Sequence, residues 1–540
     1  AALRLWALGF GLPVVSNFYV RPDESLIVQA ALLFFERHGH PQFFAYPALL
    51  TELCAVLFAA IPEEFAANPS AYFLAVRAVS AAAGIATIGV VYLIARRFCS
   101  WSWSLSAAAL YAAAPLPVRD AHFGVTDTLM TLLVTLALWM AVRHAQEAVP
   151  RSRLWVGTSL LFGLAISTKY TAVLVAPVLL VSALAGRALM QDARDRRTFA
   201  RRVTRAVAIA AVVFFALNPY ILLRAREVLD TALGMIHVFY GGAAGLPESA
   251  WSWSGAALQV LRPLAWGPGS WLALPLAACS AIWLLRRGER TPGLAVLVFG
   301  VFPFLLALLP FRHPLPFRYL LPALPGLAVL AVFAAFRLAR RRGLAVPVAA
   351  VGGVVFLWQL TLSAVLVSTL AQEDTRTLAG QWIAANVSRA TPIVLLGAPE
   401  GEPQVSESAA SIERRIAYVY RLYGKQSGMI VSELYRLLQA GAPEGYEIYR
   451  NPASTEAPAG DFLLVVSEYP MRAVEGSTME RLKEFGEMRK RVEFDPITGP
   501  MQDASFDPSD AFYLPMNPWG KVERPGPRLK LFRMNRTTLP

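Results

Sequence analysis

The sequence has few charged residues for its length. Only 16% of its 540 residues are Asp, Glu, Lys or Arg, whereas soluble domains contain about a quarter. Lys169 is the only lysine in the first 370 residues. Together with a hydrophobic fraction of 56% and a mean hydropathy of +0.46, this composition excludes an ordinary soluble globular protein. It predicts an integral membrane protein.

Several common kinds of site are also missing. The three cysteines, Cys54, Cys99 and Cys279, lie in or beside apolar segments without metal-type spacing, which favours a packing role. There is no GxxxxGK[ST] loop and no GxGxxG motif after a strand, so the familiar nucleotide sites are excluded. The net charge of +13 does not indicate a nucleic-acid partner, because the basic residues form short clusters between apolar runs.

Eleven apolar runs are candidates for membrane spans, and a shorter run over 47–60 is typical of a helix at the membrane interface. All dense arginine clusters fall on one side of this layout, which predicts a multi-pass protein of the cell membrane with a cytoplasmic N-terminus. The outer loops 16–71 and 223–265 are long, and the glycines of 234–254 indicate a mobile flap. The expected runs are 1–15, 72–95, 104–117, 125–142, 155–167, 171–186, 203–222, 266–285, 293–310, 318–336 and 344–369.

The composition changes near residue 371. Residues 371–540 have no apolar run of spanning length, and helix-like segments at 374–387, 429–439 and 476–486 alternate with strand-like runs at 393–396, 462–466 and 529–532. This alternation predicts a small α/β domain. With an odd number of spans before it, the domain is extracytoplasmic. The expected architecture is therefore a transmembrane domain, 1–370, followed by a soluble domain, 371–540.

Two adjacent acids follow the first expected span. Asp23 and Glu24 precede a segment, Ser25 to Arg37, that reads as an amphipathic helix on the outer side. Acids at a helix start are also favourable for capping and for the helix dipole, so a structural role is the alternative. A pair of acids beside an apolar span, in a chain with few acids, favours function.

Three further positions place charge at the edges of apolar runs. Asp127 lies where the span 125–142 begins, with His122 and Arg119 just before it. A charged residue at this depth is a functional candidate, and helix capping is the alternative. Lys169 and Arg318 are placed to bind a phosphate or, alternatively, to reach lipid headgroups.

Acids and cations at one membrane face suit a reaction on a lipid-linked phosphate. An acidic group can deprotonate an acceptor hydroxyl, while Lys and Arg stabilise the charge on a departing phosphate. A donor carried in the membrane is thus favoured over a soluble nucleotide sugar. His38 and His40 form a pair that can bind a divalent metal, but such loop pairs usually do not, and metal is left unassigned.

These residues resemble a known family, the GT-C membrane glycosyltransferases of the protein O-mannosyltransferase and aminoarabinose-transferase group (glycosyltransferase family 39 and relatives). The resemblance rests on an ordered set of motifs over about residues 15–325. They are Pro22-Asp23-Glu24, His40-Pro41, Tyr46-Pro47, Phe123 to Asp127, Ser167 to Tyr170, and Arg318 to Pro322.

The resemblance implies a GT-C-like fold and inverting transfer of a sugar from a polyprenyl-phosphate carrier to an acceptor hydroxyl on the outer face. Asp23 would act as general base or orient the acceptor, with Glu24 and Asp127 as the other acidic residues of the site. The carrier phosphate would contact Lys169, Arg318, Arg119 and His122, and the substrates would contact Tyr46, Tyr170, Tyr319 and His40.

Two alternatives stay open. A transporter or flippase of lipid-linked sugars would also carry charged residues in its membrane domain, but the charges here gather on the outer side, without the paired halves of many transporters. A lipid-linked glycan polymerase or ligase would use the same carrier. The sugar, the acceptor and the oligomeric state are not predicted.

Overall fold

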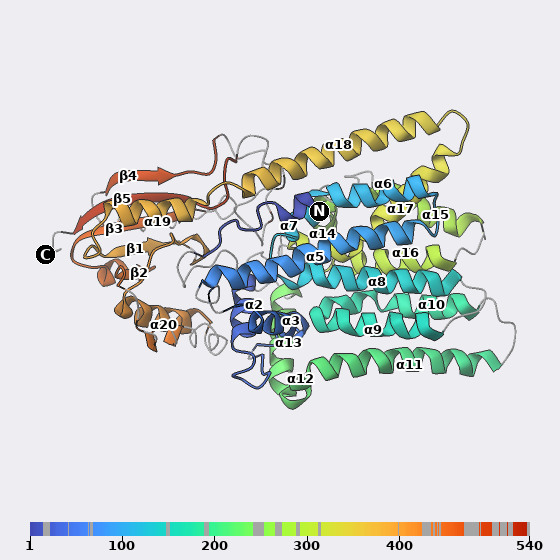
Figure 1. Cartoon of the computed structure of the whole chain (residues 1–540), viewed down its shortest axis with the longest axis horizontal. Coiled ribbons are helices and arrows are strands. Elements are labelled where there is room, and N and C mark those ends of the chain that lie inside the picture. The colour runs from blue at the N-terminus through green and yellow to red at the C-terminus, as the bar shows by residue number, and fades with distance from the viewer. Residues whose placement is uncertain are drawn as a thin grey trace. The chain divides into compact units, whose positions relative to one another are not determined.

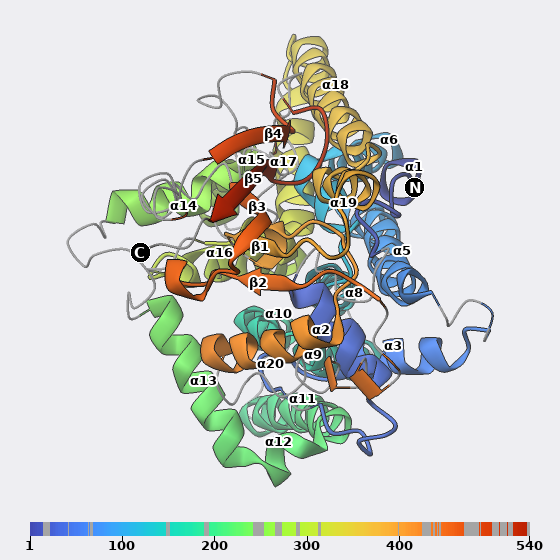
Figure 2. The same cartoon turned by 90° about the vertical axis from the view of Figure 1, so that its left-hand side faces the viewer.

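The computed structural model divides into two compact units (Figures 1 and 2). Unit 1 comprises Ala1–Leu5, Phe44–Leu53 and Arg77–Ala364, and unit 2 comprises Trp6–Phe43, Cys54–Val76 and Val365–Pro540. The predicted boundary at residue 370 therefore stays a prediction. The structure describes residues 1–13, 22–41, 43–62, 64, 68–146, 152–187, 194–240, 253–264, 273–287, 292–311, 315–397, 399–423, 434–435, 438–439, 441, 444–468, 485, 488–498, 507, 516 and 522–536.

Unit 1 is helical, and most of its helices coincide with the expected apolar runs. The helices are α1 (Ala2–Leu5), α3 (Leu49–Ala59), α5 (Pro69–Ala95), α6 (Trp101–Ala113), α7 (Pro115–Asp120), α8 (Thr126–Gln146), α9 (Ser152–Thr168), η1 (Tyr170–Val175), α10 (Pro177–Arg187), α11 (Arg194–Leu217), α12 (Pro219–Leu223), α13 (Ala225–Tyr240), α14 (Trp253–Leu264), α15 (Ala273–Arg287), α16 (Pro292–Ala307), η4 (Phe317–Ala323), α17 (Leu324–Ala339) and α18 (Ala345–Leu370). Three of the helices, α3, α5 and α18, are shared with unit 2.

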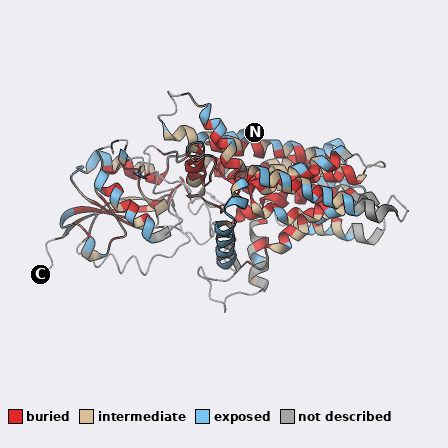
Figure 3. Ribbon diagram, turned by 90° about the horizontal axis from the view of Figure 1, so that it is seen from below, coloured by how far each residue is buried: buried red, intermediate tan, exposed pale blue. Residues whose placement is uncertain are grey.

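Among the described residues, four helical stretches are long and apolar enough to cross a membrane: 69–95, 126–146, 317–339 and 345–386, the last of which contains α18 and α19 (Thr375–Asn386). Buried residues concentrate within the bundle (Figure 3), and α17 lies inside it with 83% of its apolar window buried. In α18 the corresponding share is 28%, as expected for a helix that faces lipid. The count of about eleven spans stays a prediction.

The expected first span over 1–15 is wrong. Of its described residues, 1–13, only Ala2–Leu5 is helical, because Ala7 (φ 66°) and Gly11 (φ 51°) adopt left-handed conformations and Pro13 cannot donate a helical hydrogen bond. The expected amphipathic helix Ser25 to Arg37 also differs. Helix α2 spans Pro22–Leu32, its described side chains are buried or half-buried all round, and it places both acids in its first turn.

The outer segment 223–265 is more regular than expected. It contains α13 and α14, so residues 234–240 of the predicted flap belong to a helix, and 241–252 lie outside the described residues. A helix is present within the run 47–60 as α3, and its place at the membrane interface stays a prediction. The glycines on which the predicted flap rests, Gly241, Gly242 and Gly245, lie outside the described residues.

Unit 2 contains a five-stranded mixed sheet of order β2-β1-β3-β5-β4. Strands β1 (Ile393–Leu396), β2 (Ile448–Arg450) and β3 (Gly460–Glu468) are parallel, whereas β5 (Arg528–Arg536) is antiparallel to both β3 and β4 (Met488–Phe494). Both edge strands offer a limited surface for further strand pairing, since β2 has three residues and β4 has a register shift between Lys490 and Val492.

Alternate residues of the central strands pack on opposite faces of this sheet. On one face Ile393 and Leu463 pack with Ile383 of α19 (Thr375–Asn386), and on the other Val394 and Leu464 pack with Phe485. The strands expected at 393–396, 462–466 and 529–532 are therefore present, as is the helix expected at 374–387. The helices expected at 429–439 and 476–486 lie largely outside the described residues.

A buried ionic network joins α20 (Ala409–Tyr423) to β2. Glu407 Oε1 lies 2.6 Å from Arg415 Nη1 and 2.6 Å from Arg450 Nη2, and Ser411 Oγ donates to Glu407 Oε2 over 2.9 Å. Burial alone would raise the pKa of Glu407, but the charges of Arg450 and Arg415 and the hydrogen bonds outweigh it and hold the pKa at about 2. The charged carboxylate thus stabilises the fold.

We expect Glu407→Gln to destabilise unit 2 by about 3–5 kcal/mol near neutral pH, because it leaves the buried Arg415 without its carboxylate and Arg450 with Glu402 alone. A depressed carboxyl pKa contributes stability above its unfolded value of 4.5, and this contribution is lost as pH falls towards about 2. The difference between wild type and variant should therefore shrink between pH 4.5 and 2. Pulse proteolysis with pepsin checks this, and a constant difference over that range would contradict it.

Candidate functional site

Three predicted site residues meet at one end of the helices of unit 1. Asp127 lies in the first turn of α8, Lys169 lies at the break between α9 and η1, and Arg318 lies in η4. Each position is a junction: Lys169 is extended (φ −155°, ψ 131°), and Pro316 precedes η4. At such a junction a charged side chain can point away from its own helix and towards neighbouring elements.

The three charges form a compact cluster. Lys169 Nζ donates to Asp127 Oδ1 over 2.7 Å, and Arg318 Nε lies 3.9 Å from Asp127 Oδ2. All three side chains are nearly inaccessible, at 1% exposed for Asp127, 5% for Lys169 and 8% for Arg318. The start of α8 adds a favourable dipole for the carboxylate. One carboxylate and two cations give the cluster a net charge of +1.

Two tyrosine rings border the cluster. Lys169 Nζ lies 4.3 Å from the ring centroid of Tyr319 and 5.8 Å from that of Tyr46, both within range of a cation–π interaction. The segment after Tyr46 is held in place because Ala48 N–H donates to Asn218 Oδ1 over 2.7 Å. The predicted substrate residues Tyr46 and Tyr319 thus lie beside the predicted phosphate residue Lys169.

Tyr170 follows Lys169 but turns towards α11, where its ring lies 6.4 Å from that of Phe214. Its hydroxyl is buried and has no hydrogen-bond partner among the residues that the structure describes. An unsatisfied buried hydroxyl is costly, so it marks a place where a polar ligand group or water would be stabilised.

Arg119 and His122 have other local partners. Arg119 forms a fork with Asp120, with Nη2–Oδ2 at 3.0 Å and Nε–Oδ2 at 3.2 Å, and both side chains are fully buried. His122 Nδ1 lies 2.8 Å from the carbonyl oxygen of Val118. Their assignment to the carrier phosphate stays a prediction. Asp120 was not singled out in the sequence, although an Arg-Asp pair in an acid-poor segment is a usable signal.

Asp23, Glu24 and His40 belong to unit 2. Asp23 is half-buried and Glu24 fully buried in the first turn of α2, and His40 follows a tight turn in which His38 (φ 51°) and Gly39 (φ 78°) are left-handed. Their roles stay predictions. Among the described residues, no group of three or more His, Cys, Asp or Glu side chains is arranged to hold a metal ion.

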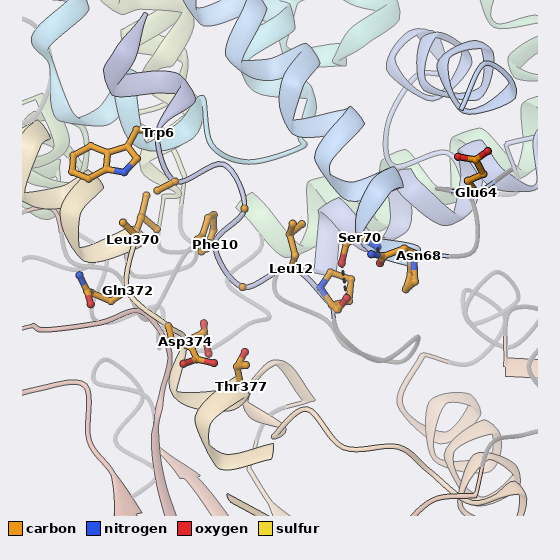
Figure 4. Close-up of a pocket in the computed structure, with 17 residues that line it drawn as sticks. Trp6, Phe10, Leu12, Glu64, Asn68, Ser70, Leu370, Gln372, Asp374 and Thr377 are labelled. Atoms are coloured by element: carbon orange, nitrogen blue, oxygen red, sulfur yellow. Dashed lines mark hydrogen bonds between the residues drawn. The ribbon is translucent and has the colours of Figure 1, made fainter. Parts of the chain in front are cut away.

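Unit 2 also contains a cavity of about 870 Å³ (Figure 4). It lies where α5 begins and α18 ends, beside the segment Trp6 to Pro13, which Ser70 Oγ anchors by donating to the Pro13 carbonyl. Glu64, Glu373 and Asp374 line it, and none of its described lining residues is Lys or Arg. The described lining therefore offers no cationic side chain to bind a phosphate.

Comparison with known families tests the predicted resemblance. Residues 69–222, from α5 to α12, match the family model for dolichyl-phosphate-mannose-protein mannosyltransferase. The resemblance is confirmed. The region matched by the mannosyltransferase model includes Asp127 and Lys169 but neither Asp23 nor Arg318. No curated protein sequence matches the chain.

One solved structure supports the same overall fold. ArnT from Cupriavidus metallidurans bound to undecaprenyl phosphate has a TM-score of 0.50 and 16% identity, covering 98% of this chain and 96% of that chain. The oligosaccharyltransferase AglB from Archaeoglobus fulgidus, in complex with an inhibitory peptide and a dolichol-phosphate, has a TM-score of 0.47 and 12% identity, covering 92% and 72%. The fold is GT-C-like, and the chain is a multi-pass membrane protein.

Proposed function

We propose that the chain transfers a sugar from a polyprenyl-phosphate donor to an acceptor hydroxyl on the extracytoplasmic face of the membrane. The Asp127–Lys169–Arg318 cluster carries this proposal, because it is a buried, net positive site at the end of membrane-length helices. The mannosyltransferase family model and the likeness of fold to ArnT, in a structure bound to undecaprenyl phosphate, support it.

The charge of the cluster matches the donor. A polyprenyl-phosphate sugar is a phosphodiester with one negative charge, which a net charge of +1 neutralises. On transfer the phosphate becomes a monoester of charge about −1.5 to −2 at pH 7, since its second pKa is about 6. Lys169 and Arg318 would therefore stabilise the leaving group more than the bound donor, which is the condition for catalysis.

The arginine clusters support the outer face. Asp127 lies in the first turn of α8, and Arg143 lies in its last turn. In the same way, Arg318 lies in η4, and Arg337 lies in the last turn of α17, the helix that follows η4. A helix of the length of α8 spans about 30 Å at 1.5 Å per residue. Because basic residues favour the cytoplasmic side, the opposite helix end, with the charged cluster, is expected outside.

In the proposed reaction, Asp23 accepts the proton of the acceptor hydroxyl as its oxygen attacks the anomeric carbon. The bond between that carbon and the phosphate oxygen breaks, and its electron pair leaves with the polyprenyl phosphate. Attack from the face opposite the phosphate inverts the anomeric centre. Glu24, Tyr46 and Tyr319 would shape the substrate site, and the sugar and acceptor remain to be identified.

The proposal is tested with the purified protein in lipid vesicles and a panel of polyprenyl-phosphate sugars. We expect one donor to be cleaved, with release of free polyprenyl phosphate in equal amount to the transferred sugar. A polymerase would lengthen its product in repeated units, which product analysis would show. Movement of intact lipid-linked sugar across the vesicle membrane without cleavage would contradict the proposal in favour of a transporter.

A further inference from the structure

Helix α13 presents an apolar stripe that nothing in the described part of the chain covers. Leu229, Leu233 and Ile236 are 57%, 54% and 54% exposed, and their i, i+4, i+7 spacing places them on one side of the helix. Glu227 and Gly234 lie on the opposite side, and Asp230 lies on the flank. A stripe of three large, exposed apolar side chains on one helix is too regular to be scattered surface hydrophobicity.

The orientation of α13 differs from that of the bundled helices. Within unit 1, α11 runs along the bundle in Figure 1, whereas α13 runs across it, and Figure 2 shows α13 lengthwise while α11 is seen end-on. Helices along the bundle cross the membrane, so a helix perpendicular to them lies parallel to the membrane surface. This is the orientation of interfacial amphipathic helices.

The exposed apolar surface of α13 continues that of its neighbours in the chain. Val207 and Val212 of α11 are 55% and 68% exposed, and Leu222 and Leu223 of α12 are 61% and 72% exposed. In a multi-pass membrane protein, such side chains on a bundle helix face acyl chains. The same lipid surface therefore extends from α11 through α12 onto α13.

This surface lies on the membrane face of the charged cluster. The end of α11 contacts the neighbourhood of Lys169 through the rings of Phe214 and Tyr170, and Asn218 accepts from the backbone beside Tyr46. Helix α13 begins seven residues after Asn218, at the same end of the bundle.

We propose that α13 is an interfacial helix whose Leu229–Leu233–Ile236 stripe lies in the acyl-chain region of the bilayer, on the face that holds Lys169. Arg224 and Arg226 are balanced by Glu227 and Asp230, and Arg224 pairs with Glu227 over 3.1 Å. Apolar burial rather than attraction to anionic lipid holds the helix there. The inference does not depend on the proposed reaction.

The test measures which side of α13 faces lipid. In a Cys279→Ser background, which removes the exposed one of the three cysteines, nitroxide labels are placed by Leu229→Cys, Leu233→Cys and Ile236→Cys. Matched controls on the opposite side are Glu227→Cys and Gly234→Cys. Each full-length variant is reconstituted in phosphatidylcholine vesicles, with and without phosphatidylglycerol, and its accessibility to oxygen and to a water-soluble nickel chelate is measured.

Labels on the stripe should be several-fold more accessible to oxygen than to the nickel chelate, and the controls should show the reverse, with no change on adding phosphatidylglycerol. High nickel accessibility on the stripe would overturn the inference, because the stripe would face water. Low accessibility to both reagents would also overturn it, because another segment or a second copy of the chain would cover the stripe. A requirement for phosphatidylglycerol would overturn the apolar basis of the attachment.

Discussion

Replacing Lys169 with methionine is expected to lower kcat for sugar transfer by about 10²–10³-fold, the usual effect of removing one preorganised group that stabilises developing charge. The ammonium lies 2.7 Å from Asp127 and within 4.3 Å of the Tyr319 ring, in a site closed to bulk water. Water therefore cannot stabilise a developing negative charge there in place of the ammonium. Release of free polyprenyl phosphate at saturating donor measures the loss.

The same substitution also breaks a buried ion pair, which costs about 3–5 kcal/mol of stability when one partner is removed. The double variant Lys169→Met with Asp127→Asn separates the two effects, because it removes both charges at similar side-chain volume. It should regain much of the thermal stability while kcat stays low. Recovery of activity together with stability would show that the pair is structural and that the phosphate binds elsewhere.

Replacing Asp23 with asparagine is expected to lower kcat by about 10²–10⁴-fold, the contribution of a general base, with little change in the apparent affinity for donor. Asn has nearly the shape of Asp, and the charge of Asp23 in the first turn of α2 is worth only about 0.3–1 kcal/mol to the helix. Stability should therefore change little. Single-turnover transfer measured over a range of pH tests this expectation.

Glu24→Gln is the matched control for Asp23→Asn. Glu24 is fully buried, whereas Asp23 is half-buried in the same turn, so Glu24→Gln should lower the melting temperature more and kcat less. The reverse order of effects would move the base from Asp23 to Glu24. Equal transfer by wild type and Asp23→Asn would mean that Asp23 only stabilises the start of α2 and that another residue is the base.

The individual members of the charged cluster could be predicted from the sequence, but the contact between their side chains could not. Asp127, Lys169 and Arg318 each stand out because charge is rare beside apolar runs, and a charged group there must be satisfied. Their contact depends on how α8, η1 and η4 pack, and side-chain periodicity does not encode that packing. The fork between Arg119 and Asp120 was missed for a different reason: attention to isolated charges overlooks adjacent ones that neutralise each other.

The errors in the fold have local causes. Residues 1–15 are apolar enough for a span, but hydropathy ignores the left-handed conformations at Ala7 and Gly11. Segment 223–265 was read as a loop because its polar residues and glycines lower the average, although α13 has a clear helical period. Strand β2 has only three residues and escapes any window long enough to detect alternation.

The two edge strands of the sheet, β2 and β4, affect how copies of the protein interact when they meet in a membrane. Proteins confined to a surface meet each other often and in similar orientations, and an open strand edge would then recruit the same edge of a neighbour. The short β2 offers few backbone groups for such pairing, and the irregular register of β4, within the basic run Arg489 to Arg491, interrupts the other edge. Neighbouring copies should thus collide without joining into a shared sheet.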